Sequence, residues 1–333
     1  MKVNIVGGGL SGVTAAILLK EKGHEVEIFE CRDHIGGNCY DEKNDDGCTV
    51  HKYGSHIFHT NDEDVWKFLN RYTKFNDYKH RVRANTSEGL ISIPFSKKTA
   101  EQIGRDLDPL EIQELLFRDY SERHWGIPWE ELPKSISGRV PNKRDDYNDL
   151  YFTDKYQGIP ENGYTEMFKA MLDGIKIHVG VDRDEWKDLK CDKLIWTGKV
   201  SEYFDESQGH LPYRSLRFDH KRVKKDELYS WSGGAVINEC NKKPFNRTMD
   251  SSVYLNEQVE YTIHTRDYPE EYKPGTNEPI YPKPFGDGPD IYQKYKQMTL
   301  TDTNTIFLGR LATYKYLDMW MAIKQVMVKL KDI

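Results

Sequence analysis

The hydrophobic pattern of the first 30 residues predicts a strand, a helix and a second strand. The segment "KVNIVGGGLSGVTAAILLKEKGHEVEIFE" has a short apolar run, a glycine-rich turn, a stretch with helical apolar spacing, and a second apolar run that ends at Glu30. A strand that passes through a glycine turn into a helix is typical of the start of a nucleotide-binding α/β domain.

Two later segments have a similar pattern and predict that the chain returns to this first sheet. Residues 192–204, "DKLIWTGKVSEYF", read as an apolar strand that leads into Thr197 and Gly198. The segment "TNTIFLGRLATYKYLDM" reads as a strand, a turn and the start of a helix. We therefore expect a discontinuous nucleotide-binding domain made of residues 1–74, 172–210 and 298–333.

The rest of the chain predicts a helical unit and an antiparallel sheet. Residues 97–171 begin with helical apolar spacing and are expected to form a mainly helical domain with a mobile loop. Period-two stretches in residues 80–95 and 233–268 predict strands, so we expect an antiparallel sheet from residues 75–96 and 211–297. The predicted fold class is α/β, with a discontinuous Rossmann-like domain, an inserted helical domain and an antiparallel β-sheet domain.

Composition and charge exclude several classes of protein. With 48 basic and 54 acidic residues, the net charge of −6 gives no basic excess for binding nucleic acid. No apolar run approaches the roughly 20 residues of a membrane span, so no membrane association is expected. The five cysteines lack the spacing of a metal site and read as free thiols, which favours a cytoplasmic location.

The glycine turn carries a dinucleotide-binding motif. Gly7, Gly9 and Gly12 fit G-x-G-x-x-G, which gives a tight turn, close approach to a pyrophosphate and close packing of the helix on the strand. Glu30 follows at the distance of the acid that binds a ribose hydroxyl. Both NAD and FAD are bound by this unit.

The residues after Glu30 favour FAD over NAD. "ECRDHIGGNCYD" supplies Arg32, a second glycine pair ending at Gly37, and Asn38. This extension resembles the two-dinucleotide-binding flavoproteins, in which a basic residue and a glycine-rich loop follow the ribose acid along the diphosphate of FAD. The expected cofactor is FAD, and the discontinuous domain is expected to bind it.

Several further segments, in the same order along the chain, resemble the UDP-galactopyranose mutases. They are "YGSHIFHTND", "YSERHWGIPWEELP", "SGRVPNKRDDYNDLYFTDKYQGIPENGYTEM", "PYRSL", "KPFNRTM", "EEYKPGTNEPIYP" and "GRLATYKYLDM". The resemblance spans essentially the whole chain. It implies an isomerase that interconverts the pyranose and furanose forms of a nucleotide diphosphate sugar, such as UDP-galactopyranose and UDP-galactofuranose, for cell-surface polysaccharide synthesis.

The resemblance also implies a mechanism and partners. N5 of reduced FAD attacks C1 of the sugar and displaces the nucleoside diphosphate, so the ring can open and close again through another hydroxyl. FAD would be reduced by NAD(P)H or another external reductant. The substrate is then a nucleotide sugar, and the sequence is compatible with either a monomer or a homodimer.

The same resemblance assigns roles to individual residues. The expected catalytic residues are Arg247, Arg144, His56, Tyr316 and Asp318. The expected FAD-binding residues are Gly7, Gly9, Gly12, Glu30, Arg32, Gly37, Asn38, Arg310, Asp318 and Met319. The expected substrate-binding residues are Tyr120, Trp125, Tyr156, Arg144, Arg247, Tyr281 and Tyr316, with Tyr120 and Tyr156 on opposite faces of the base.

Two candidate cations lie near a predicted helix start, and two share the predicted loop. Arg310 and Lys315 are expected at the helix N-terminus, where backbone N–H groups also favour a diphosphate. Arg144 is the expected loop arginine, and Lys143 competes with it because the chain has one extra residue there.

His56 and His59 are three residues apart, but no further ligand recurs at metal spacing. No metal is expected, and His59 is interpreted as a packing residue.

Departures from the family pattern leave the substrate open. Pro141-Asn142-Lys143-Arg144 stands where the family usually has Pro-Val-Arg, "TMDSSVYL" replaces an acidic, histidine-containing stretch, and Ala312 replaces a glycine. A different sugar or base is therefore compatible with the sequence. Two alternative functions also stay open: an amine-oxidase-like flavoprotein oxidoreductase, and a binding protein that holds FAD and a nucleotide sugar without catalysis.

Overall fold

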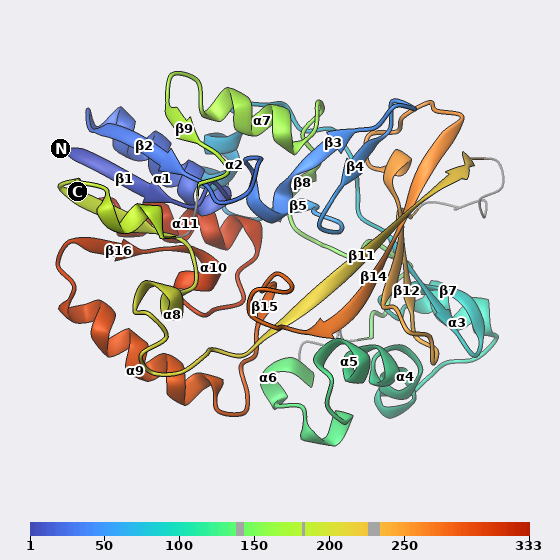
Figure 1. The fold of residues 1–333 in the computed structure, drawn as a ribbon. Coiled ribbons are helices and arrows are strands. Elements are labelled where there is room, and N and C mark those ends of the chain that lie inside the picture. The colour runs from blue at the N-terminus through green and yellow to red at the C-terminus, as the bar shows by residue number, and fades with distance from the viewer. Residues whose placement is uncertain (138–142, 182–183, 226–233) are drawn as a thin grey trace.

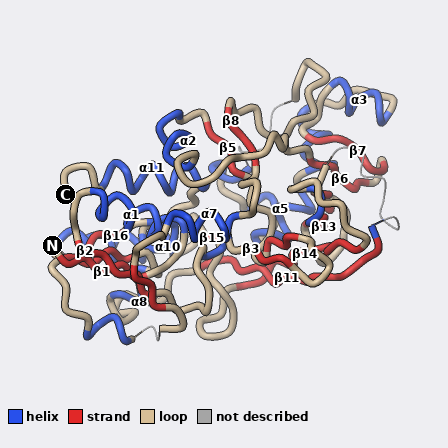
Figure 2. Tube along the Cα trace, turned by 90° about the horizontal axis from the view of Figure 1, so that it is seen from above, coloured by secondary structure: helices blue, strands red, loops and turns tan. Residues whose placement is uncertain are grey.

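The computed structural model of the chain describes residues 1–137, 143–181, 184–225 and 234–333. Figure 1 shows a parallel sheet at one end of the molecule and a larger, mostly antiparallel sheet at the other. The two termini lie close together at the outer edge of the parallel sheet in Figures 1 and 2.

The parallel sheet contains the N-terminal strand predicted from the sequence and the two later returns of the chain. Its strands in spatial order are β16 (Thr305–Phe307), β10 (Lys193–Trp196), β1 (Lys2–Val6), β2 (Glu25–Phe29) and β9 (Lys176–His178). All neighbouring pairs are parallel. Three separated parts of the chain therefore build one sheet, as expected for a discontinuous Rossmann-like domain.

Two helices cover one face of this sheet. α1 (Leu10–Glu21) packs against β2 and against α11 (Met319–Lys329). Apolar residues of β1 and α1 such as Ile5 and Ala16 are fully buried between these layers. The first and last helices of the chain thus share one core.

The second sheet has seven strands drawn from two parts of the chain. In spatial order they are β15 (Tyr281–Pro282), β11 (Tyr213–Lys224), β14 (Tyr261–Glu271), β13 (Arg247–Asp250), β12 (Val236–Glu239), β6 (Val82–Thr86) and β7 (Gly89–Ile93). β12 pairs with β6 in parallel, while the other neighbours are antiparallel. The sheet therefore joins the two strand-forming segments expected from the sequence, with one parallel pair at their junction.

Helices with clear capping signals lie beside the second sheet. α3 (Lys97–Ile103), α4 (Pro109–Leu116), α5 (Arg118–Trp125) and α6 (Lys134–Ser137) follow β7 in the chain. Asp108 accepts hydrogen bonds from the first turn of α4, and the carboxylate of Glu111 accepts one from the Asp108 N–H, which forms a capping box. α5 ends at Gly126, whose φ of +74° is left-handed. Figure 1 places α4, α5 and α6 at the lower edge of the second sheet.

The remaining elements connect the two sheets or cover their edges. The two small sheets are β3 (Asp41–Lys43) with β4 (Thr49–His51), and β5 (Phe58–Thr60) with β8 (Tyr156–Gly158). The other helices are α2 (Glu63–Leu69), α7 (Tyr164–Met171), α8 (Val200–Tyr203), α9 (Gly288–Thr301) and α10 (Gly309–Ala312). In the part of the chain that the structure describes, no helix is both long and apolar enough to cross a membrane. The domain boundaries expected from the sequence stay a prediction.

Candidate active site

The turn between β1 and α1 depends on two glycines for its shape. Gly7 has a φ of +105°, which disfavours any residue with a side chain. A Cβ on Gly12 would lie 1.9 Å from the carbonyl oxygen of Gly7. Gly9 is different, because its Cβ would lie 3.7 Å from Cα of Gly37, an ordinary contact. Gly7 and Gly12 therefore maintain the turn itself, whereas Gly9 keeps the surface of the turn open to a ligand.

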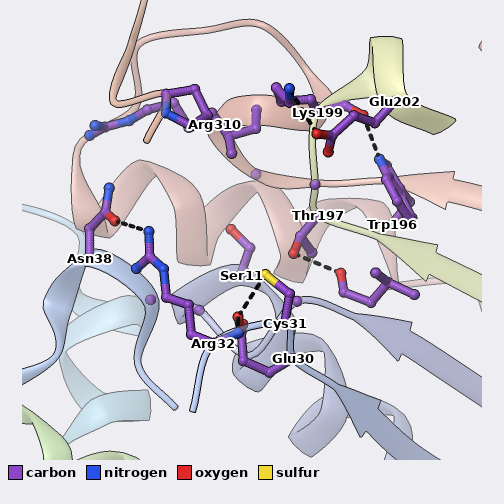
Figure 3. A pocket seen from close by; sticks show the side chains of 18 of the residues that line it. Ser11, Glu30, Cys31, Arg32, Asn38, Trp196, Thr197, Lys199, Glu202 and Arg310 are labelled. Carbon is purple, nitrogen blue, oxygen red and sulfur yellow. Dashed lines mark hydrogen bonds and ion pairs between the residues drawn. The ribbon is translucent and has the colours of Figure 1, made fainter. Parts of the chain in front are cut away.

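Glu30 ties this turn to the end of β2. Its buried carboxylate accepts hydrogen bonds from the N–H of Gly8 at 2.6 Å and from the N–H of Arg32 at 2.8 Å. Figure 3 shows Glu30 beside Cys31, whose thiol is 3.4 Å from the same carboxylate. The predicted ribose-binding acid thus lies next to the glycine turn.

Arg32 has an unused donor in the wall of a cavity. Its Nη2 lies 3.1 Å from Oδ1 of Asn38 and 3.3 Å from Glu278, and its guanidinium lies 4.4 Å from the ring centre of Tyr53. Its Nη1 is buried and has no hydrogen-bond partner among the described residues. A buried guanidinium nitrogen without a partner costs free energy, so this atom indicates a ligand that supplies an acceptor.

A cavity of about 660 Å³ runs from the glycine turn to the C-terminal segment. Figure 3 shows side chains of both regions around it. Nine predicted residues line it: Gly7, Gly9, Glu30, Arg32, Gly37, Asn38, His56, Arg310 and Met319. Gly12 lies beneath the turn, and Asp318 is the N-cap residue of α11 and does not line the cavity.

The residues of this cavity fit FAD. The volume lies within the range of roughly 300–1,000 Å³ that is usual for ligand sites. The N-terminus of α1 suits a diphosphate, the carboxylate of Glu30 suits a ribose hydroxyl, and Nη1 of Arg32 suits an anionic oxygen. Gly7, Gly9, Glu30 and Arg32 therefore line the same cavity.

Arg310 connects the cavity to a group of tyrosines. Its Nη1 donates to the carbonyl of Ile280 at 3.1 Å and its Nη2 to the carbonyl of Leu317 at 2.8 Å. Its guanidinium lies 5.5 Å from the ring centre of Tyr281 and 5.1 Å from that of Tyr316. The two tyrosine rings are stacked, with centres 5.8 Å apart. One arginine thus borders both the FAD cavity and the predicted substrate residues.

The predicted helix start at this segment is wrong. Arg310 lies in the four-residue helix α10, and the long helix α11 begins only at Met319. Between them Tyr314 has a φ of +46°, and its hydroxyl donates to the carbonyl of Pro212 at 2.6 Å. This left-handed residue ends the helical path and leaves Lys315 exposed, so neither cation lies at the N-terminus of α11.

Arg247 lies on β13 and is held by a buried carboxylate on β14. The N–H and Nε of Arg247 donate to the two oxygens of Asp267 at 2.7 and 2.6 Å, and Asp267 is fully buried. Burial by itself would lower the pKa of the guanidinium, but Asp267, Tyr120 and Tyr281 hold it well above its ordinary value. Arg247 is therefore a permanent cation in a fixed orientation.

The charge of Arg247 acts on both parts of the site. This charge contributes to the lowered pKa of His56. It also acts to lower the pKa of Tyr316, against other groups that raise it. It also acts on the pKa of Tyr120, which is raised above its ordinary value mainly by burial. The charge of Arg247 therefore reaches both α5 and the FAD cavity.

α5 brings three ring side chains to this region. The rings of Tyr120 and His124 are nearly parallel, with centres 6.2 Å apart. His124 meets Tyr281 edge-on at 4.9 Å. Trp125, expected from the resemblance to bind substrate, is the last residue of α5 and is buried with Trp129. The ring of His124 therefore contacts both Tyr120 and Tyr281, which brings these two predicted substrate residues into one region.

The structure does not bring all predicted substrate residues to this region. Tyr156 stacks on Trp66 with ring centres 5.0 Å apart, on a strand that Figure 1 places away from α5. Arg144 donates to carbonyl groups of its own loop, including that of Asn148 at 3.2 Å, and Lys143 pairs with Asp106. Both loop cations therefore interact with neighbouring polar groups of the protein. The loop residues 138–142, which include Pro141 and Asn142, lie outside the described residues.

The two histidines singled out from the sequence differ in their surroundings. His56 lines the cavity, and its Nδ1–H donates to the carbonyl of Gly54 at 2.9 Å. Burial, with smaller effects of His51 and nearby arginines, lowers the pKa of His56 to about 3, so the ring is neutral. His59 stacks on Phe152 and pairs with Asp154, which agrees with a packing residue. Within residues that the structure describes, no cluster of His, Cys, Asp or Glu could hold a metal ion.

Several residues that the site uses were not identified from the sequence. Asp267 fixes Arg247 from a strand 20 residues later, and no local pattern shows that pairing. His124 lies within the recognised segment "YSERHW" but was not assigned a role. Thr197 lines the cavity, and its position directly after an apolar strand was the available signal. Lys199 also lines the cavity, and Figure 3 shows it next to Glu202.

The chain matches two family models and several curated proteins. A family model described as UDP-galactopyranose mutase matches residues 115–316, and one described as an NAD(P)-binding Rossmann-like domain matches residues 5–72. Among curated proteins, a dTDP-fucopyranose mutase from Escherichia coli is 34% identical, covering 97% of this chain and 96% of that protein. A probable UDP-galactopyranose mutase from Klebsiella pneumoniae is 31% identical, covering 98% and 92%.

Solved structures show the same fold. A crystal structure of reduced UDP-galactopyranose mutase has a TM-score of 0.75 at 16% identity, covering 99% of this chain and 95% of the other. A putrescine oxidase with bound putrescine has a TM-score of 0.63 at 12% identity, covering 100% and 99%. At these identities, the likeness shows the fold alone.

The comparisons confirm the fold class and FAD as the cofactor expected from the sequence. The family model spans more than half of the chain, and the matching relatives extend over nearly all of it. The chain belongs to the UDP-galactopyranose mutase family.

Proposed function

We propose that this nucleotide-sugar mutase interconverts the pyranose and furanose forms of a galactose-configured sugar carried on a pyrimidine nucleoside diphosphate. The observation that carries the proposal is the position of Arg310. It lines the FAD cavity and also lies over Tyr281 and Tyr316, so cofactor and substrate residues share one continuous site.

Arg247 would hold the diphosphate of the substrate. Asp267 binds Nε and Nη2 of Arg247, whereas Nη1 makes no hydrogen bond with a described residue. A guanidinium that is anchored on one edge can offer its other edge to a phosphate without losing its orientation. Arg247 would therefore act by positioning the leaving group rather than by exchanging a proton.

The tyrosines would complete the site as neutral donors. Tyr316 is 40% exposed, and its pKa is raised above the ordinary value, so its hydroxyl keeps its proton at neutral pH and can donate to a phosphate oxygen. Tyr281 stacks on Tyr316 and would donate beside it. Tyr120 would stack on the base, which contributes ~1–3 kcal/mol but tolerates different bases.

FAD, when bound and reduced, supplies a nucleophilic N5 for C1 of the sugar. The chain's own residues would hold C1 at the mouth of the FAD cavity and balance the charge of the departing diphosphate. Neutral His56 would line the cavity there as a hydrogen-bond acceptor at Nε2, because its Nδ1–H is used by Gly54. The resemblance assigns Asp318 a catalytic role, and we propose that it acts beside Tyr316. For Arg144 to bind the substrate, its guanidinium would have to release the carbonyl groups of its own loop.

Galactose and fucose are the two main candidates for the sugar of the substrate. The relatives named dTDP-fucopyranose mutase and probable UDP-galactopyranose mutase are 34% and 31% identical to this chain, which is too small a difference to choose between them. Fucose lacks the 6-hydroxyl of galactose, so the two differ at one polar contact. The sequence departs from the family pattern at residues 141–144 and 248–255, and we expect these segments to decide which of the two sugars is bound.

A substrate panel tests the proposal. The reduced, FAD-loaded protein is incubated with UDP-galactopyranose, dTDP-fucopyranose and the N-acetylgalactosamine and arabinose relatives, and the products are separated by chromatography. We expect a furanose product from one of the first two. Absence of furanose from every sugar, with FAD bound, would contradict the proposal.

Location and assembly belong to the same proposal. All five cysteines are free, which supports a cytoplasmic site of action with access to NAD(P)H as reductant. We further propose a homodimer, and light scattering after size-exclusion chromatography would distinguish it from a monomer.

A further inference from the structure

His124 is held rigidly between the predicted base-binding and diphosphate-binding residues. The guanidinium of Arg214 donates to the carbonyl of His124 at 2.7 Å and to the carbonyl of Arg123 at 3.2 Å. These bonds fix the end of α5 on the second sheet. The ring of His124 then lies between Tyr120 and Tyr281, one helical turn beyond Tyr120.

A chain of hydrogen bonds fixes which nitrogen of His124 carries the proton. Arg123 Nε donates to Oδ1 of Asn246 at 2.7 Å, and a guanidinium can only donate. The amide oxygen of Asn246 must therefore face Arg123, so its NH₂ group faces Nδ1 of His124 at 3.0 Å. Because Nδ1 then accepts, the neutral ring carries its proton on Nε2.

The surroundings keep the His124 ring neutral. Burial, together with Arg247, Arg214 and Arg123, lowers the pKa of His124 to about 3. Protonation would also place an N–H against the NH₂ group of Asn246. The groups that face this ring come from α5, β11, β13 and β15 and are Tyr120, Arg123, Arg214, Arg247 and Tyr281.

We propose that His124 binds the nucleotide half of the substrate, with its Nε2–H donating to an oxygen of the nucleoside diphosphate, and that Asn246 is the residue that positions this donor. Nε2 has no hydrogen-bond partner among the described residues, although Nδ1 has one. The inference rests on the proposed function, because it needs a nucleotide between Tyr120 and Arg247. It adds a neutral N–H donor of fixed position to the cations and tyrosines proposed to bind the substrate.

Calorimetric titration of the FAD-loaded protein with UDP and with dTDP tests the donor. His124→Phe keeps a ring but removes both nitrogens, and we expect binding to weaken roughly three- to tenfold if the acceptor is a neutral carbonyl oxygen, and by about tenfold or more if it is a charged phosphate oxygen. His124→Gln retains an amide donor and should recover part of that loss. His220→Phe, on β11, is the control and should bind like the wild type. Equal affinity of His124→Phe and the wild type would overturn the proposal.

Titration with CDP tells whether the acceptor is the 4-carbonyl oxygen of the base. Cytosine has an amino group where uracil and thymine have a carbonyl oxygen. A wild-type preference for UDP over CDP that His124→Phe abolishes would place the acceptor on the base. An equal loss for UDP and CDP would place it on a group that both nucleotides share, such as a diphosphate oxygen, and either result supports a donor at Nε2.

Asn246→Asp tests whether Asn246 keeps the proton of His124 on Nε2. A carboxylate accepts from both Arg123 and His124, so it should draw a proton to Nδ1 and allow the ring to become charged. We expect the ratio of variant to wild-type dissociation constants to change between about pH 5 and pH 8, the range in which histidine usually titrates. In this ratio the titration of the ligand's own phosphate cancels.

Nitrogen NMR of His124 gives a readout that does not depend on activity. The wild type should show a proton on Nε2 only, and Asn246→Asp should show a proton on Nδ1. A wild-type proton on Nδ1, or a flat affinity ratio in the variant, would overturn the proposal. Failure of the wild type to bind either nucleotide would instead contradict the proposed function.

Discussion

Arg247 carries the most specific prediction at the scale of single residues. Arg247→Ala should leave FAD content unchanged but reduce substrate affinity or turnover roughly ten- to a hundredfold, because a charge-assisted hydrogen bond contributes about 1.5–3 kcal/mol. FAD content is read from flavin absorbance and turnover from product chromatography. Arg217→Ala is a matched control, since Arg217 is exposed on the same sheet and pairs with Glu270. Unchanged kinetics in Arg247→Ala would show that this arginine has only a structural role, as the ion-pair partner of Asp267.

Single residues also show what the sequence could predict. Gly7, Gly9 and Glu30 could be placed because their roles follow from a short, local motif next to a strand. Arg247 could be nominated only by resemblance, since its partner Asp267 is set by the pairing of β13 with β14. The hydrogen-bond chain through Asn246 could not be predicted at all, because it joins α5 to a residue 122 positions away.

At the scale of elements, the β1 to α1 turn separates folding from cofactor binding. Gly12→Ala places a Cβ 1.9 Å from the Gly7 carbonyl and should destabilise the fold by about 1–3 kcal/mol as an overpacked contact. Gly9→Ala meets only an ordinary contact at 3.7 Å, so the melting temperature of the FAD-free protein should stay near that of the wild type.

FAD content should nevertheless fall in Gly9→Ala, because the added methyl group occupies the path of the diphosphate. Thermal melting of the FAD-free forms and flavin absorbance of the loaded forms measure the two effects separately. Full FAD content in Gly9→Ala would show that the diphosphate does not approach this glycine.

The elements predicted from the sequence are right where the pattern is local and wrong where a distant contact overrides it. The strand of residues 192–204 and the strand before Gly309 both lie in the parallel sheet. The helix expected near Arg310 breaks at Tyr314, whose hydroxyl is held by Pro212 and Lys283 from other parts of the chain. Periodicity of apolar residues contains no information about such a tether.

At the scale of the whole molecule, buried neutral histidines predict a loss of stability in acid. Burial lowers the pKa of His51 to about 4 and, with Arg247 and His59, that of His80 to about 3. An unfolded chain binds these protons near pH 6.5, so the folded state binds fewer protons below that pH. Stability should be constant above about pH 6.5 and fall between about pH 6.5 and pH 4, by at most about 1.4 kcal/mol per pH unit for each histidine.

Urea unfolding at pH 7, 6 and 5 measures this slope. His51→Asn should make the slope smaller, even though it also removes the acceptor for the N–H of His56. A stability that does not change from pH 7 to pH 5 would show that these rings are charged, or solvated, in the folded protein.

The architecture of the whole molecule places FAD and the nucleotide sugar in one site, and the central claim is that this site catalyses isomerisation without net oxidation. The most direct test follows furanose formation under anaerobic conditions with oxidised protein and with protein reduced by one equivalent of dithionite, using the sugar identified by the panel. We predict product only from the reduced protein, over many turnovers and without further reductant. Equal turnover by the oxidised protein, or consumption of one equivalent of reductant for each product, would contradict the account.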